Sequence, residues 1–183
     1  RLFDHYLPGW KTDPYSLRYA LAIPTEDLWQ GHMDEKRAPI KYVNETHDAQ
    51  MNPDVFTIGF ARRATQYKRG NMLFADVERL ARIAEKSKGI QIIYAGKAHP
   101  ADNDGKLLIQ EIKRNMERLG AKVRCIYLEN YDMKMAKRLV SGVDMWLNTP
   151  TRPQEASGTS GMKAACNGVP QFSILDGWWI EGH

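Results

Sequence analysis

Five short, nearly uninterrupted apolar runs constrain the fold of this chain more than any other feature. We predict them to be strands, at residues 55–60, 90–95, 123–128, 143–147 and 169–175. Runs without polar alternation are typical of strands buried on both faces of a parallel sheet. The segments between them carry apolar residues at helical spacing, at residues 71–86, 103–119, 132–140 and 159–167. Strands that alternate with helices predict an α/β fold with a doubly wound, parallel, Rossmann-like sheet.

Residues 1–53 lack this alternation and are rich in aromatic residues, prolines and charges. Thr25, followed by two acids, predicts the start of a helix. We expect that helix to continue towards Asn44, with a kink or a break at Pro39. We therefore interpret residues 1–53 as a helical preface or linker and residues 54–183 as the α/β domain.

The composition is ordinary for a soluble globular domain, with 43% hydrophobic and 26% charged residues in a chain of 183. No apolar run is long enough to cross a membrane, and residues 1–6 lack the charged-then-apolar order of a signal peptide. Cys125 and Cys166 lack the spacing of a metal site or a redox pair. We therefore expect free thiols, no metal and a reducing, cytoplasmic location. The net charge of +4 suits an anionic ligand but is too scattered for nucleic acid.

The loop after the first predicted strand holds four cations and no acid, namely Arg62, Arg63, Lys68 and Arg69. Clustered like charges repel unless an anion or solvent screens them, so the loop is an oxyanion site or a solvated basic turn. Doubly wound sheets bind ligands at the carboxyl ends of their strands, which favours the oxyanion site. Arginine offers phosphate a two-pronged donor, and lysine offers it a mobile charge.

A glycine-rich stretch opens the last predicted helix. Its free N–H groups can bind an anion, and the hydroxyls of Thr159 and Ser160 can add to them. Lys163, one turn further on, can reach an aldehyde whose phosphate lies at the start of the helix, as a pyridoxal phosphate site requires. Taken alone, the stretch is explained more simply as a surface helix with a polar cap.

The run Glu-Ala-Ser-Gly-Thr-Ser-Gly-Met-Lys at 155–163 resembles the pyridoxal phosphate signature of α-glucan phosphorylases. Residues 62–69 resemble the phosphate-binding segment of that family. Residues 96–100, 129–131 and 173–179 match further family blocks in the family's order. The resemblance covers nearly all of the predicted α/β domain and is strongest with the shorter bacterial and archaeal branch.

The resemblance implies a role for each matching residue. Lys163 would carry pyridoxal phosphate covalently. The cofactor phosphate would be held by Gly158, Thr159, Ser160, Tyr131 and Arg62. The substrate phosphate would be bound by Arg63 and Lys68, and the glucosyl hydroxyls by Glu155, Ser157 and Gly158. The groups expected to act in catalysis are Arg62, Arg63, Lys68 and Glu155. The chain departs from the animal enzymes at three positions: Arg62 replaces a lysine, Ser160 a glycine and Asp132 a basic residue.

The implied reaction is reversible phosphorolysis, in which an α-1,4-glucan and orthophosphate give glucose 1-phosphate and a shortened glucan. In this family the glucan lies in a cleft between two Rossmann-like domains, and the five predicted strands complete only one. We therefore expect a C-terminal portion that is inactive alone. Its expected partners are the N-terminal domain of the same enzyme and a second copy in a homo-oligomer.

Two other functions remain open from the sequence. A sugar-nucleotide glycosyltransferase related to glycogen synthases shares the paired architecture but needs neither pyridoxal phosphate nor Lys163. A non-catalytic binding domain is compatible with a chain that holds half of the two-domain fold. Trapping of the cofactor by borohydride distinguishes the phosphorylase from the glycosyltransferase, and a longer encoded protein would distinguish it from the binding domain.

Overall fold

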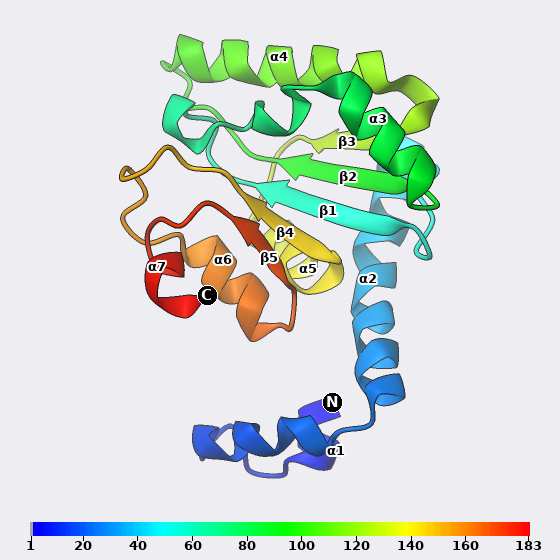
Figure 1. The fold of residues 1–183 in the computed structure, drawn as a ribbon, viewed down its shortest axis with the longest axis vertical. Helices are drawn as coiled ribbons and strands as arrows, with labels where there is room; N and C mark the ends of the chain where they lie inside the picture. Colours follow the sequence, from blue (N-terminus) through cyan, green and yellow to red (C-terminus); the bar gives the residue numbers. More distant parts are fainter. Residues whose placement is uncertain (1) are drawn as a thin grey trace.

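The computed structural model of the chain describes residues 2–183 (Figure 1). Its five strands are β1 (Phe56–Ala61), β2 (Ile90–Ala95), β3 (Arg124–Leu128), β4 (Met145–Asn148) and β5 (Gln171–Ser173). All neighbouring strands are parallel, and their order across the sheet is β3-β2-β1-β4-β5. The predicted α/β class with a doubly wound parallel sheet is confirmed.

Helices cover both faces of this sheet. The longer ones are α2 (Thr25–His47), α3 (Val77–Lys86), α4 (Asn103–Leu119), α5 (Met133–Gly142) and α6 (Thr159–Cys166). The other helical elements are the short α-helices α1 (Leu2–Tyr6) and α7 (Trp179–Gly182) and the 3-10 helices η1 (Pro14–Ala22), η2 (Gln66–Lys68), η3 (Met72–Phe74) and η4 (Gly120–Lys122). Figure 1 shows α3 and α4 on one face and α2, α5 and α6 on the other. Within residues 2–183, no helix has the length and apolar character needed to span a membrane.

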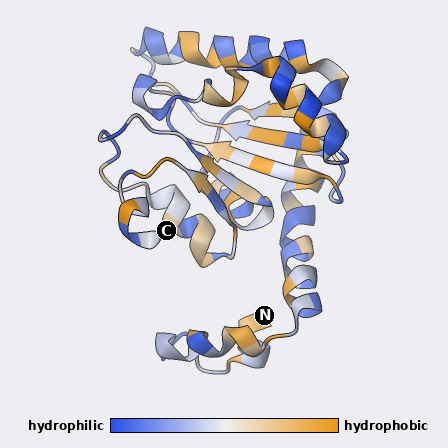
Figure 2. Cartoon of the chain, viewed as in Figure 1, coloured by the Kyte–Doolittle hydropathy of each residue, from blue (hydrophilic) through white to orange (hydrophobic). Residues whose placement is uncertain are grey.

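Alternating residues of the central strands pack into two separate cores. Ile58 and Ile92 lie in the core beneath α3 and α4, whereas Ile93 and Trp146 lie in the core beneath α2, α5 and α6. All four side chains are buried. Figure 2 shows mainly hydrophobic residues along β1 and β2, as expected for strands covered on both faces. Burial of each large aliphatic side chain contributes about 1.5–3 kcal/mol, so these two layers fix the strand ends that carry the site.

Most predicted bounds differ from those in the structure by one or two residues, and two elements differ by more. The helix expected over 71–86 begins only at Val77, after η3. Asp76 sets this start, because its carboxylate accepts a hydrogen bond from the Arg79 N–H at 2.8 Å, as an N-cap does. The strand expected over 169–175 is reduced to the three residues of β5, which lies at the sheet edge and pairs with β4 alone.

We expected Pro39 to kink or break its helix. The expectation of a break is wrong, because α2 continues from Thr25 to His47. Pro39 is buried against α5, where a Cβ atom on Gly142 would lie 2.6 Å from Pro39 Cγ. The lack of a side chain at Gly142 therefore lets the two helices approach closely. The free energy gained by this packing outweighs the cost of the helical hydrogen bond that proline cannot donate.

A buried ion pair anchors α2 at the amino-terminal edge of the sheet. Lys36 Nζ lies 2.6 Å from Asp144 Oδ2 and 2.9 Å from the carbonyl oxygen of Val55. His32 Nε2 lies 2.7 Å from the other Asp144 carboxylate oxygen. The second half of α2 thus packs as part of the α/β unit, whereas α1 and η1 lie away from the sheet (Figure 1). The boundary between preface and domain stays a prediction.

Candidate active site

The candidate site lies where the strand order reverses, at the carboxyl ends of β1 and β4. From β1 the chain crosses to β2 and β3 on one side of the sheet, and it then continues through β4 and β5 on the other. The loops after β1 and β4, residues 62–69 and 149–158, therefore leave adjacent strand ends in different directions. Doubly wound sheets bind their ligands in the crevice at such a position.

Hydrogen bonds join these two loops to each other. The Thr149 hydroxyl donates to the carbonyl oxygens of Lys68, at 3.0 Å, and Arg69, at 3.1 Å. The Arg69 guanidinium donates in return to the carbonyl oxygens of Thr149 and Pro150, each at 2.9 Å. Arg69, one of the four cations of the basic loop, is therefore bound to backbone, and it fixes the loop that carries the other three.

The Glu155 carboxylate lies between two cations of the basic loop. Lys68 Nζ lies 2.9 Å from Glu155 Oε1 and 2.7 Å from Oε2, and Arg62 Nη2 donates to the same Oε2. The side chains of Arg62, Lys68 and Glu155 are only 5%, 11% and 6% exposed. Two cations share one carboxylate, so the cluster keeps an excess of positive charge in surroundings that screen it weakly.

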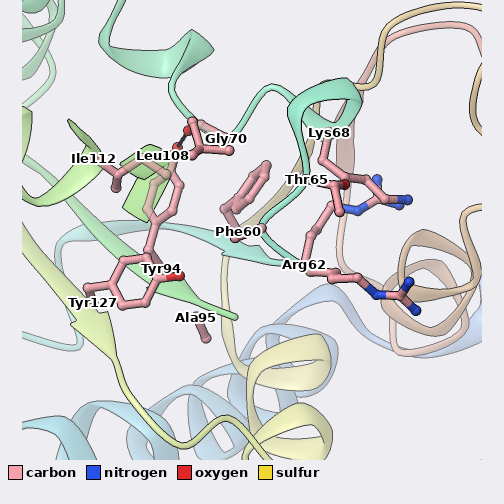
Figure 3. A pocket seen from close by; sticks show the side chains of 12 residues that line it. Phe60, Arg62, Thr65, Lys68, Gly70, Tyr94, Ala95, Leu108, Ile112 and Tyr127 are labelled. Atoms are coloured by element: carbon pink, nitrogen blue, oxygen red, sulfur yellow. Dashed lines mark hydrogen bonds between the residues drawn. The ribbon is translucent and has the colours of Figure 1, made fainter. Parts of the chain in front are cut away.

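Arg62 has donor capacity to spare for a ligand. Its Nη1 is buried and has no hydrogen-bond partner within the part of the chain that the structure describes. Burial lowers the pKa of the Arg62 guanidinium, and the neighbouring Glu155 carboxylate opposes that shift. Figure 3 shows the Arg62 and Lys68 side chains extending away from the aromatic rings of Phe60 and Tyr94. A buried, partnerless guanidinium nitrogen beside a second cation is suited to binding an oxyanion.

The other residue expected to bind the substrate phosphate lies apart from this cluster. Arg63 is exposed, and no hydrogen bond or ion pair of its side chain occurs among residues 2–183. The structure thus brings Lys68 together with Arg62 and Glu155, and leaves Arg63 at the rim. Its predicted role requires it to act from the solvent side.

The start of α6 follows the cluster closely. Gly158 precedes α6 in a left-handed conformation, with φ of 84°, and a Cβ atom built on it would lie 3.6 Å from Glu155 Cγ. Thr159 is exposed, whereas the Ser160 hydroxyl is buried and lacks a partner among the described residues. Lys163 is exposed on the next turn, and within the same residues its ammonium makes no ion pair. The helix start therefore offers free donors and an accessible amine.

Tyr131 lies further from these groups. It follows β3, which is separated from β1 by β2, and it packs against the core beneath α2 and α5. Burial raises the pKa of its hydroxyl, and the Asp132 carboxylate adds to the effect. Its predicted contact with the cofactor phosphate stays a prediction.

The predicted site residues do not include the corner after β5, residues 176–178. The Glu155 N–H donates to Asp176 Oδ2 at 2.9 Å, and the Trp178 N–H donates to the carbonyl oxygen of Ser157 at 2.9 Å. The only signal for this corner in the sequence was that residues 173–179 resemble a family block. That resemblance does not indicate that the corner contacts Glu155.

A doubly wound α/β domain with two cations at its switch point and a glycine-opened helix beside it is suited to binding an anionic ligand. Residues 19–182 match the family of carbohydrate phosphorylases. The chain belongs to that family, as the resemblance predicted.

Individual relatives agree with this assignment. The chain is 47% identical to a glycogen phosphorylase of Aquifex aeolicus, in a match that covers 88% of the chain and 26% of that protein. It is 41% identical to a maltodextrin phosphorylase of Thermococcus litoralis, over 88% of the chain and 21% of that protein. It is 50% identical to a glycogen phosphorylase of Mycobacterium tuberculosis, over 71% of the chain and 15% of that protein. The chain thus spans about a quarter or less of the length of these relatives.

Proposed function

We propose that this chain is the cofactor-carrying part of an α-glucan phosphorylase, which transfers a glucosyl unit from an α-1,4-glucan to orthophosphate. The observation that carries the proposal is the pair of cations Arg62 and Lys68, which share the Glu155 carboxylate at the switch point. Glu155 lies three residues before Gly158, the glycine that precedes α6. Two of the relatives are a glycogen phosphorylase and a maltodextrin phosphorylase, which supports the same substrate class.

The charge of the site suits a reaction between phosphates. Orthophosphate enters the reaction and glucose 1-phosphate leaves it, and pyridoxal phosphate brings a phosphate group of its own. Two phosphates in one site repel each other, so the site needs cations that are already in place. Arg62 and Lys68 meet this need, with Arg63 at the rim as the third cation.

The residues at the start of α6 fit pyridoxal phosphate. The buried Ser160 hydroxyl and the Arg62 Nη1, both without partners among residues 2–183, are donors of the kind that a phosphate group requires. Gly158 and Thr159 bring backbone N–H groups at a helix start, where an anion is favoured. We propose that these residues, with Tyr131, hold the cofactor phosphate and that Lys163 binds the cofactor covalently. When bound, the cofactor supplies a phosphate that assists proton transfer to the substrate phosphate.

The remaining residues orient the substrates. Glu155, Ser157 and Gly158 lie on one loop and hold the hydroxyls of the transferred glucosyl unit. Arg63 and Lys68 hold the substrate phosphate against that unit. Fixing two reactants in this way converts a bimolecular step into an effectively unimolecular one.

We further propose that the N-terminal domain of the same enzyme closes the cleft, and that a second copy of the enzyme completes a homo-oligomer. The free thiols of Cys125 and Cys166 fit a reducing compartment, such as the cytoplasm.

Covalent labelling tests the proposed function directly. Pyridoxal phosphate is added to the folded chain, the product is reduced with borohydride, and the labelled peptide is mapped. We expect the label at Lys163. The variant Lys163→Arg should lose it, whereas Lys137→Arg, which changes an exposed lysine of α5, should keep it. Labelling spread over many lysines, or absent from Lys163, would contradict the proposal and would favour the sugar-nucleotide transferase or the binding domain.

A further inference from the structure

The corner after β5 holds the loop after β4 by its backbone. Asp176 is 2% exposed, and its Oδ2 accepts the hydrogen bond from the Glu155 N–H at 2.9 Å. Glu155 is therefore fixed twice. Its side chain is held by Arg62 and Lys68, and its main chain is held by Asp176.

The corner itself has little freedom to move. Asp176 Oδ1 accepts from the Gly177 N–H at 3.0 Å, so both oxygens of this carboxylate are bound to backbone. Gly177 has a φ of 58°, which favours glycine. A Cβ atom there would lie 2.5 Å from the carbonyl oxygen of Ser157 and 3.1 Å from that of Glu155. The corner and the loop thus meet backbone against backbone, with no room for a side chain.

The position of this loop decides where both the Glu155 carboxylate and the start of α6 lie. Glu155 and Ser157 lie on the segment of chain that runs directly into the first N–H groups of α6. The Trp178 N–H bonds to the Ser157 carbonyl oxygen at 2.9 Å, so the corner holds the loop at two points. Loss of the Asp176 carboxylate would leave a buried Glu155 N–H without a partner, and the loop would then have to move to satisfy it.

We propose that Asp176 is a positioning residue, which fixes the Glu155 carboxylate between Arg62 and Lys68 and aligns the start of α6 with that pair. The identity of the bound anion rests on the proposed function. The geometric role of Asp176 does not, so the two can fail separately.

The first measurement uses no ligand. Melting temperatures are compared in phosphate-free buffer for the chain, Asp176→Asn, Glu155→Gln and the double variant. Asn keeps one acceptor oxygen, so we expect a fall of about 5 °C for Asp176→Asn. If Asp176 acts by positioning Glu155, the two losses should not add, and the double variant should melt near the less stable single variant. Additive losses would overturn the proposal.

The second measurement is the affinity for inorganic phosphate by calorimetry. We expect Asp176→Ala to weaken binding by about tenfold, because the Glu155 carboxylate and the start of α6 would both move. Asp176→Asn should weaken binding less. The control is Asp76→Ala, which removes another carboxylate that accepts a backbone hydrogen bond, at the start of α3. It should lower the melting temperature without changing phosphate affinity. Equal losses of affinity in the Asp76 and Asp176 variants would show that Asp176 supports only overall stability.

A third readout needs no variant to fold. The Glu155 amide should exchange slowly with deuterated water in the unmodified chain, and rapid exchange would overturn the proposal. A chain that binds no phosphate would count against the proposed function. The melting data and the Glu155 amide would still decide the role of Asp176.

Discussion

Lys68 Nζ lies 2.7 Å from the Glu155 carboxylate, although the two residues are 87 positions apart and follow different strands. They meet because β1 and β4 are neighbours at the point where the strand order reverses. A buried pair of this kind is costly to break from one side, by about 3–5 kcal/mol, because the remaining charge is left unpaired. The site therefore tolerates little change in the charges that form it, and its response to anions can be tested by changing them one at a time.

Phosphate should stabilise the chain through this pair. At a hundredfold excess over its Kd, a bound anion should raise the melting temperature by about 5–10 °C. Lys68→Met should remove most of the gain, and Arg63→Ala should remove a smaller part, since Arg63 lies at the rim. Lys41→Met, which changes an exposed lysine of α2, should leave the gain intact. The same phosphate response in all four proteins would show that the anion binds elsewhere.

Asp144 should make stability depend on acid pH. Burial acts to raise the pKa of this carboxyl, but hydrogen bonds from His32, Lys36 and the Thr57 N–H outweigh it, and the pKa lies below its ordinary value. A lowered folded-state pKa gives a stabilisation that is present above a pH of about 4 and is lost as the pH falls below that value.

The variant Asp144→Asn tests this dependence. It should cost about 3 kcal/mol at neutral pH, and its stability should fall less steeply below pH 4. Chemical unfolding at several pH values measures both effects. Asp34→Asn, which breaks an exposed pair with Arg37, is the control and should change stability by less than about 1 kcal/mol. Parallel acid profiles for the chain and Asp144→Asn would refute the assignment.

Two glycines should respond to alanine in opposite directions. A Cβ atom on Gly59 of β1 would lie 2.9 Å from Val143 Cγ1, so Gly59→Ala should destabilise the chain by about 1–3 kcal/mol. Gly31 lies inside α2, where the nearest atom to such a Cβ is Leu2 Cδ2 at 3.6 Å. Gly31→Ala should therefore stabilise the chain by about 0.5–1 kcal/mol through helix propensity. Melting temperatures check both, and changes of the same sign would contradict the packing described around β1.

The isolated chain should not catalyse phosphorolysis. Its sheet supplies one wall of the proposed cleft, and loss of orientation alone can remove about 7–11 kcal/mol of barrier reduction. The assay is release of glucose 1-phosphate from maltodextrin by the chain after addition of pyridoxal phosphate. Turnover comparable to that of a full-length phosphorylase would show that the catalytic groups have been misplaced.

Local sequence signals predicted most of the fold. The helix at 103–119 was predicted with its observed bounds from its apolar spacing. In the structure Asp102 caps its start and Gly120 ends it. The strand at 90–95 was also predicted with its observed bounds, because a short apolar run between two helical segments is typical of a strand buried on both faces. Prediction failed where distant residues decide, as at Pro39, whose place inside α2 depends on Gly142.

In the candidate site, too, local sequence signals predicted some features, and contacts between distant residues decided the others. The sequence indicated that the cations of residues 62–69 would lie at a strand end. It could not show that Lys68 would share a carboxylate with Arg62 while Arg63 faces solvent, because that depends on which strand lies beside β1. Asp176 was missed because it acts on a backbone N–H, and every residue except proline has one.

The loop after β4 is held on one side by the loop after β1, through Thr149, and on the other by the corner after β5, through Asp176. The side chains that form these bonds are those of Arg69, Thr149 and Asp176, and none of them is among the residues expected to bind a ligand. Mutation can therefore change Arg63, Ser157 or Thr159 without moving these loops, and the preference of such a domain for one ligand over another can drift while its architecture persists. Substitutions of the residues that join the loops after β1, β4 and β5 should instead be poorly tolerated. Each of these loops is held in place by hydrogen bonds to another of them, so a change in one would displace the others.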